Sequence, residues 1–167
     1  MHYAICRGVY VIGGRELSHV IDNNVFIIEL PNNRYILFET GSGLGFLNTL
    51  RNILELSINP KNIAYIAISH AHIESSGATY NWLTVAPNTY TVMHEPDASF
   101  SRKGDPLYTC SCLYNIEYRS YPISISIPLY KAKYILSDKP YVELIPVSYT
   151  HLRAHETSLH LVCRLLL

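Results

Sequence analysis

The sequence predicts an α/β fold in which helices pack against a layered sheet. Two observations support this class. Short apolar runs rich in Ile and Tyr, which are typical of strands, recur along the chain. Segments with helical periodicity lie between these runs, and an all-β sandwich would lack them. With 167 residues, the chain has the length of one domain and is long enough to bury a substantial core.

The amino-terminal part is expected to be a series of strands. Residues 3–12 form a first apolar run, which the glycines at 13–14 end. Residues 24–30 and 35–40 form the two strands of a hairpin. The residues between them, 31–34, are Pro, Asn, Asn and Arg, which tolerate the backbone dihedrals of a turn.

A helix and a buried strand are expected to follow the hairpin. Residues 46–56 carry apolar side chains at helical spacing, and Asn59–Pro60 ends this helix. Residues 63–68 are apolar throughout and predict a buried strand. The apolar positions that define the helical spacing are Leu47, Leu50, Ile53, Leu54 and Ile58.

The rest of the chain continues the alternation of helices and strands. Its expected helices are short, and its last expected strands are separated by proline and lysine. The helices are residues 78–85, 95–100 and 105–116, and the strands are residues 89–93, 118–127, 134–136 and 141–146.

Composition argues against several classes of partner. Lys plus Arg and Asp plus Glu number 13 each, so a net charge of zero favours neither nucleic acid nor an anionic membrane surface. No run of about 18 apolar residues predicts a membrane span, and residues 1–7 do not resemble a secretory leader. We therefore expect a cytoplasmic protein with reduced thiols. The cysteines are Cys6, Cys110, Cys112 and Cys163.

The most informative segment follows the buried strand of residues 63–68. It places His70, His72 and Glu74 on one loop at the edge of the expected sheet. Two histidines one residue apart can bind one zinc ion through neutral ring nitrogens, and a carboxylate can complete the site or hold the attacking water. The segment therefore predicts a metal site suited to hydrolysis, because a bound metal makes water a nucleophile near neutral pH.

Each polar feature also has a plainer interpretation. The two motif histidines can be ordinary imidazoles on a polar loop. His94 is interpreted as a structural histidine or a helix-entry residue, and His19 and Asp22 are expected to hydrogen bond within their own loop. The glycine-rich residues 41–45 precede a helix, as phosphate-binding loops do, but no Lys-Ser/Thr follows them. We interpret this turn as a place where the backbone passes close to the metal loop.

Seven blocks of sequence carry a resemblance to a known family. The blocks are residues 9–14, 16–19 with Asp22, 35–41, 59–63, 69–77, 94–98 and 104–106. In this order they resemble the metallo-β-lactamase fold hydrolases, above all the hydroxyacylglutathione-hydrolase-like branch, over residues 3–146. The resemblance implies an αββα sandwich, an α/β architecture that the chain represents by its amino-terminal half.

The resemblance also implies a ligand set. The family's metal loop reads His-x-His-x-Asp-His, and its first two histidines serve one zinc while the Asp and last His serve another. Here these positions hold His70, His72, Glu74 and Ser75. One zinc ion, or another divalent metal, is expected on the first three, because a neutral hydroxyl is a weak ligand beside imidazole or carboxylate. Glu39 stands where the family strand ends in an Asp that anchors the loop.

The function implied by the resemblance is metal-dependent hydrolysis of an ester, thioester or related bond in a small molecule. Glu74 is expected to position or deprotonate the attacking water. The remaining ligands of such enzymes lie in their carboxy-terminal half, so the chain by itself is expected to be inactive. The alternative is a non-catalytic binding or scaffold protein that kept the fold and lost the dinuclear site.

The character of the sequence changes near Val147. Residues 147–167 resemble the in-frame translation of a transposase-end sequencing adaptor followed by an index and a flow-cell primer. We therefore expect a partial domain at residues 1–146 and a non-native tail. The alternative is a natural helix in which His151 and His155 have a spacing suited to zinc.

Overall fold

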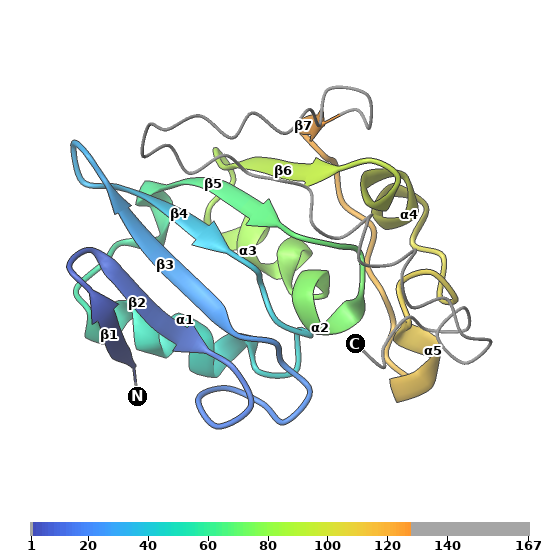
Figure 1. Ribbon diagram of the computed structural model, residues 1–167, viewed down its shortest axis with the longest axis horizontal. Helices are drawn as coiled ribbons and strands as arrows, with labels where there is room; N and C mark the ends of the chain where they lie inside the picture. The colour runs from blue at the N-terminus through green and yellow to red at the C-terminus, as the bar shows by residue number, and fades with distance from the viewer. Residues whose placement is uncertain (1, 128–167) are drawn as a thin grey trace, which may run out of the picture.

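The computed structural model describes residues 2–127, which form one seven-stranded sheet with helices against it (Figure 1). The strands lie side by side in chain order. Each neighbouring pair from β1 to β4 is antiparallel, and each pair from β4 to β7 is parallel. The strands are β1 (Tyr3–Cys6), β2 (Val9–Gly13), β3 (Val25–Leu30), β4 (Arg34–Phe38), β5 (Ile63–Ile68), β6 (Tyr90–His94) and β7 (Ile125–Ile127).

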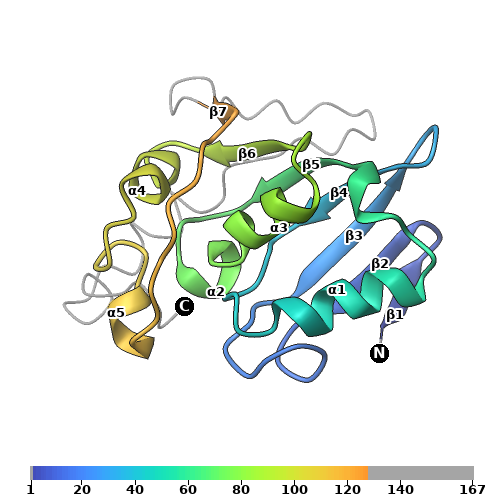
Figure 2. The same cartoon turned by 180° about the vertical axis from the view of Figure 1, so that it is seen from behind.

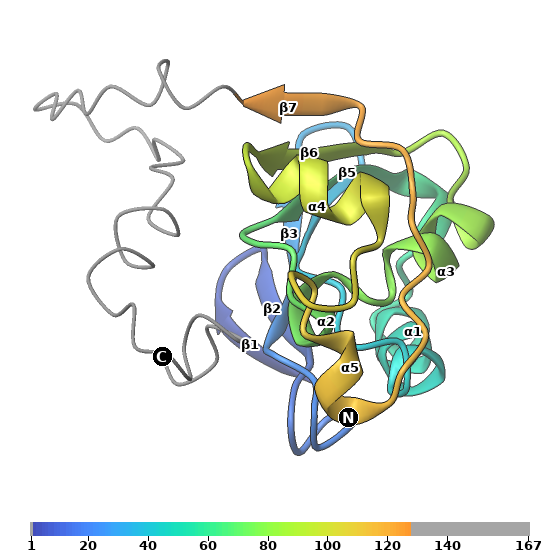
Figure 3. The ribbon, with the colours of Figure 1, turned by 90° about the vertical axis from the view of Figure 1, so that its right-hand side faces the viewer.

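Helices α1 and α3 lie on one face of the sheet (Figure 2). The short helices α2, α4 and α5 gather beyond the carboxyl ends of the parallel strands (Figure 3). The helices are α1 (Phe46–Glu55), α2 (Ile73–Ser76), α3 (Thr79–Val85), α4 (Asp97–Lys103) and α5 (Ser111–Tyr114), with a 3-10 turn, η1, at Pro60–Asn62. None of these helices is long and apolar enough to cross a membrane. The layered arrangement confirms the predicted α/β class.

The first apolar run folds as two strands and not as one. Strands β1 and β2 are antiparallel neighbours, with Tyr3 opposite Val11. The chain reverses at Arg7 and Gly8, and Gly8 has a φ of +77°, which a glycine adopts without a steric penalty. Run 3–12 therefore contains a tight turn that its apolar composition hides.

The predicted hairpin is confirmed as β3 and β4. Phe26 lies opposite Phe38, and the pairing continues to Leu30 opposite Arg34. The turn contains Asn32 and Asn33 with φ values of +63° and +55°. Asparagine is among the residues that enter the left-handed region most readily, so the turn chemistry was readable from the sequence.

Helix α1 begins and ends within one residue of its predicted bounds, but its buried face is different. Leu47 and Leu54 are 75% and 55% exposed, whereas Ile53 is fully buried. The buried polar residue Asn52 donates a hydrogen bond from Nδ2 to the backbone oxygen of Ile12 in β2, at 2.8 Å. This contact orients the helix on the sheet and turns two leucines toward solvent.

The core lies between the sheet and helices α1 and α3. Strand residues such as Ile27, Leu37 and Ile66 are fully buried there, together with Trp82 of α3. The Trp82 ring meets the ring of Phe46 of α1 edge to face, with 5.1 Å between centroids. Helix–sheet packing of this kind fixes the carboxyl ends of β4, β5 and β6, where the polar residues of the motif follow.

The second half matches the predicted elements less closely. Helix α3 and strand β6 are confirmed, and α4 begins two residues later than predicted. Residues 105–116 contain only the four-residue α5, and residues 118–127 contain only the three-residue β7. Tyr118 and Tyr121 are buried and use their hydroxyls in hydrogen bonds near α4, so this stretch runs outside the sheet ladder. The predicted strands 134–136 and 141–146 and the tail lie outside the described residues.

Candidate metal centre

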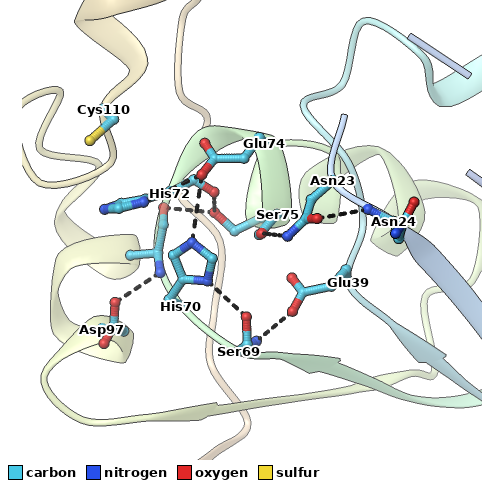
Figure 4. A network of polar contacts seen from close by, with 12 residues as sticks. Asn23, Asn24, Glu39, Ser69, His70, His72, Glu74, Ser75, Asp97 and Cys110 are labelled. Atoms are coloured by element: carbon cyan, nitrogen blue, oxygen red, sulfur yellow. Dashed lines mark hydrogen bonds and ion pairs between the residues drawn. The ribbon is translucent and has the colours of Figure 1, made fainter. Parts of the chain in front are cut away.

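The metal motif lies where β5 ends, between the sheet and α2 (Figure 4). Strand β5 pairs with β4 on one side and β6 on the other, so its carboxyl end is held on both sides. The chain then turns through Ser69–His72 into α2. The backbone amide of Ile73 donates a hydrogen bond to the backbone oxygen of Thr109 at 2.8 Å, and this bond ties the start of α2 to the segment before α5. The loop is therefore anchored at both of its ends.

The three predicted ligands come together. Their candidate ligand atoms all lie within 4.8 Å of one another. Glu74 Oε1 lies 3.6 Å from His70 Nε2 and 3.4 Å from His72 Nδ1. The two imidazole rings meet at 78°, with 4.6 Å between centroids. Two ring nitrogens and one carboxylate oxygen thus face a common point.

Burial and charge shape the protonation of this cluster. Burial is the largest influence on the pKa of His72 and lowers it, which favours the neutral imidazole that a metal requires. Burial also lowers the pKa of His70, but neighbouring carboxylates, above all that of Glu74, outweigh it and raise this pKa. Burial by itself raises the pKa of Glu74, and its two histidine partners lower it to about 2. Glu74 is therefore ionised at neutral pH.

Ser69 and Glu39 hold the first histidine in place. Ser69 Oγ lies 2.7 Å from His70 Nδ1, which leaves Nε2 facing Glu74. The Ser69 amide donates to Glu39 Oε1 at 3.1 Å. Glu39 therefore occupies the anchoring place that the sequence predicted for it. Its pKa is raised because its side chain is buried.

The cluster fits a zinc ion. Glu74 Oε2 is buried and makes no hydrogen bond to any residue from 2 to 127, and such an unsatisfied oxygen is unfavourable without a partner. Two imidazoles and one carboxylate are a common protein ligand set for a zinc ion that keeps one open position. The residues His70, His72 and Glu74 would hold the ion.

Ser75, which stands where the family has a ligand of a second metal, is engaged in hydrogen bonds. Ser75 is fully buried, and its hydroxyl accepts a hydrogen bond from Asn23 Nδ2 at 3.1 Å. Its backbone oxygen accepts from the amide of Thr40 at 2.7 Å. Asn23 was not singled out from the sequence, because it lies on a distant loop before β3. That Ser75 is not a metal ligand stays a prediction.

The remaining candidates differ from their expected roles at two residues. His19 Nδ1 accepts a hydrogen bond from the amide of Ile21 at 3.3 Å, within its own loop as expected. Asp22 accepts from Ser18 of that loop but also from Ser42 of the glycine-rich turn, so its predicted role is only partly confirmed. His94 is buried at the end of β6 and outside the metal cluster, but neither ring nitrogen has a hydrogen-bond partner in the described part of the chain. A hydrogen-bonded structural role for His94 is therefore wrong for the described residues, and the expectation that His94 is not a metal ligand stays a prediction.

The glycine-rich turn passes close to the metal loop, as predicted. The amide of Ala78 donates to the backbone oxygen of Gly41 at 2.9 Å. A Cβ atom placed on Gly77 would lie 2.5 Å from the backbone oxygen of Ser42, which shows how closely the two backbones approach. Cys6, Cys110 and Cys112 form no disulfide within residues 2–127, whereas Cys163 lies beyond them.

Comparison with known proteins places this fold and loop in a family. The model of the metallo-beta-lactamase superfamily matches residues 20–110, more than half of the 167 residues. The chain belongs to the metallo-beta-lactamase superfamily. The matched range contains β3 to β6 and the complete candidate metal cluster. A comparison with curated proteins finds no match.

Solved structures support the fold. The chain resembles an HARLDQ-motif mutant metallo-beta-lactamase from Cronobacter sakazakii, with a TM-score of 0.63 and 19% identity over 75% of this chain and 46% of that one. It also resembles FEZ-1 from Legionella gormanii, with a TM-score of 0.64 and 14% identity over 76% and 46% of the two chains. For GOB-18 from Elizabethkingia meningoseptica the TM-score is 0.63 and the identity 20%, over 75% and 44%. The chain thus spans less than half the length of these enzymes.

Proposed function

We propose that the chain is the amino-terminal half of a zinc-dependent hydrolase that cleaves an ester, thioester or related bond in a small molecule. Membership of the superfamily and the convergence of His70, His72 and Glu74 support this proposal. The observation that carries it is the half-buried Glu74 carboxylate, which shares one oxygen between two imidazoles and leaves the other, a buried atom, without a partner in the described structure. Buried polar atoms in folded proteins are almost always paired, and a cation would supply the missing partner.

Each residue of the cluster has a distinct role in this proposal. His70 and His72 hold the metal, and the Ser69 hydroxyl keeps the His70 ring oriented. Zinc supplies Lewis acidity, which activates water near neutral pH. Glu74 stays ionised, because its pKa is about 2, and so it can accept a proton or hydrogen bond from the attacking water. Other divalent metals that prefer the same ligands would bind to the same three residues, which by themselves discriminate weakly between such metals.

A mononuclear site is the form we propose. Ser75 stands at the place of a second-metal ligand and is engaged by Asn23 and Thr40. The finer proposals are that the parent belongs to the hydroxyacylglutathione-hydrolase-like branch, acts in the cytoplasm on a soluble small molecule, and binds neither nucleic acid nor membrane. The balance of 13 basic and 13 acidic residues supports the last of these. We also propose that residues 147–167 are adaptor-derived.

The activity is tested on the chain extended by the carboxy-terminal half of its parent gene. We expect zinc-dependent hydrolysis of a panel of thioesters and esters, and a loss of about 100-fold or more in kcat/KM in Glu74→Gln, in the range for a positioned acid–base group. Glu95→Gln is the matched control, because Glu95 pairs with Arg102 on the surface. An extended protein that binds zinc but hydrolyses nothing would favour the binding or scaffold alternative.

A further inference from the structure

We infer that side chains outside the ligand set clamp the backbone of Ala71 and thereby position His70 and His72; this inference rests on the proposed metal site. Ala71 lies between the two histidines and is fully buried. Its amide and its carbonyl are both bound by side chains from other parts of the chain. We call Asp97, Ser76, Tyr118 and Ser101 the Ala71 clamp.

The amide is bound by Asp97, the first residue of α4. The Ala71 amide donates to Asp97 Oδ1 at 2.9 Å, and both groups are buried (Figure 4). Asp97 is only 5% exposed. A hydrogen bond to a carboxylate is stronger than one between neutral groups, and burial removes the competition from water. Helix α4 therefore holds the loop at a point midway between the two ring-bearing residues.

The carbonyl is bound by Ser76 of α2. Ser76 Oγ lies 2.8 Å from the Ala71 oxygen and 2.9 Å from the hydroxyl of Tyr118. The Tyr118 hydroxyl also lies 3.0 Å from Ser101 Oγ. Ser101 is one turn along α4 from Asp97, so both sit on the same face of that helix. The same helix thus reaches Ala71 directly at the amide and through two hydroxyls at the carbonyl.

The clamp explains how a loop without regular backbone pairing holds the rings of His70 and His72 in a fixed relative position. Among residues 2–127, neither the β5 ladder nor the backbone of α2 satisfies the amide or the carbonyl of Ala71, and both groups depend on side chains of the clamp. All four clamp residues are buried polar groups, which an apolar core would not need. Outer residues that fix metal-bearing segments commonly change metal affinity about 10- to 100-fold when replaced. Asp97, Ser76, Tyr118 and Ser101 are therefore positioning residues and not ligands.

Cobalt(II) binding by the 167-residue chain tests the inference, because its visible absorption spectrum reports ligand geometry. We expect Asp97→Ala to weaken cobalt affinity about 10- to 100-fold and to alter the spectrum. Asp97→Asn keeps an acceptor oxygen and should restore the spectrum and much of the affinity. Tyr118→Phe keeps the ring and should weaken binding in the same direction. Asp105→Ala is the matched control, since Asp105 accepts an amide hydrogen bond from Leu107 in an exposed turn.

A second readout needs no metal. Hydrogen exchange of the Ala71 amide is compared with that of Ile66 in β5, which reports global opening. Asp97→Ala should accelerate exchange at Ala71 relative to Ile66, and Asp97→Asn should not. Unchanged relative exchange in Asp97→Ala, or an Asp97→Asn variant that behaves like Asp97→Ala, would overturn the clamp. A wild-type chain that binds no cobalt would contradict a metal site formed by His70, His72 and Glu74 alone, and the exchange result would still decide the clamp.

Discussion

Glu39 combines two unfavourable features in one residue. Its φ is +62°, a conformation that costs a non-glycine residue roughly 1–3 kcal/mol. Its carboxylate is 3% exposed, and Oε2 finds no hydrogen-bond partner between residues 2 and 127. The same residue holds the Ser69 amide beside His70. Strain of this kind persists where the surrounding structure requires it, and here it lies directly beneath the candidate metal loop.

Replacing Glu39 by Gln should stabilise the metal-free chain at neutral pH by at least about 1 kcal/mol, because the neutral amide avoids burying an ionised carboxylate, whose desolvation costs more than that of a neutral polar group. The pKa of Glu39 is raised above 4.5 because the side chain is buried, so the folded state is more stable when Glu39 is protonated. The stability that this group gives is present below pH 4.5 and is lost as the pH rises through the raised value. The gain from Glu39→Gln should therefore shrink as the pH falls.

Denaturant unfolding of both proteins between pH 4 and pH 8 measures this gain. Glu29→Gln is the control, because Glu29 lies exposed on β3. A gain for Glu39→Gln that does not depend on pH would show that the buried carboxylate is not its source.

At the scale of the elements, the site depends on close contact between the glycine-rich turn and α2. A Cβ atom on Gly77 would lie 2.5 Å from the Ser42 oxygen and 2.6 Å from the Ile73 oxygen. We predict that Gly77→Ala destabilises the chain by about 1–3 kcal/mol through overpacking and also weakens zinc binding, because the loop that carries the ligands must shift.

Gly8→Ala is the comparison for this prediction. Gly8 has a φ of +77°, and a Cβ atom there would meet nothing closer than 3.4 Å. This variant should lose stability through backbone strain and keep its zinc affinity. Equal zinc affinities for Gly77→Ala and the wild type, measured by titration, would show that the packing of the glycine-rich turn against α2 does not affect the metal site.

Elements with strong local signals were predictable, and features set by distant contacts were not. The apolar run of β5 and the helical spacing of α1 indicate their elements directly. The buried face of α1 depends on Asn52 and its partner in β2, which no local pattern reveals. In the site, the three alternate motif residues His70, His72 and Glu74 were readable from the sequence. Asn23 and Asp97 act across sequence separations of 52 and 26 residues, so only the fold brings them to the loop.

At the scale of the whole molecule, the sheet carries apolar side chains on both faces. Along each strand, side chains point alternately toward the helix-covered face and the opposite face. The strand registers place side chains of the opposite face side by side in one row across β2 to β6. The row runs through Val11, Phe26, Phe38, Ala67 and Val92, of which the two phenylalanines and Val92 are only partly buried. Sheet-on-sheet packing buries such a face in a sandwich. We therefore expect the isolated chain to be poorly soluble, as large apolar faces promote association.

The exposed leucines of α1 provide a test of the overall arrangement. Leu47 and Leu54 are 75% and 55% exposed, so replacing both with Lys should change the free energy of unfolding by less than about 1 kcal/mol. The double variant should also stay monomeric to higher concentration, which light scattering measures. Leu50→Lys is the contrasting variant, because Leu50 packs against the core. A large loss of stability in the Leu47/Leu54 variant would mean that α1 is turned differently on the sheet.

The most direct test is a zinc titration of the 167-residue chain against a competing chromophoric chelator. We predict one bound zinc per chain, lost in His72→Ala and in His70→Ala and retained in His19→Ala, whose ring accepts a hydrogen bond from Ile21 in its own loop. Failure of the wild-type chain to bind zinc, or binding that survives the loss of both motif histidines, would contradict a metal centre at the end of β5.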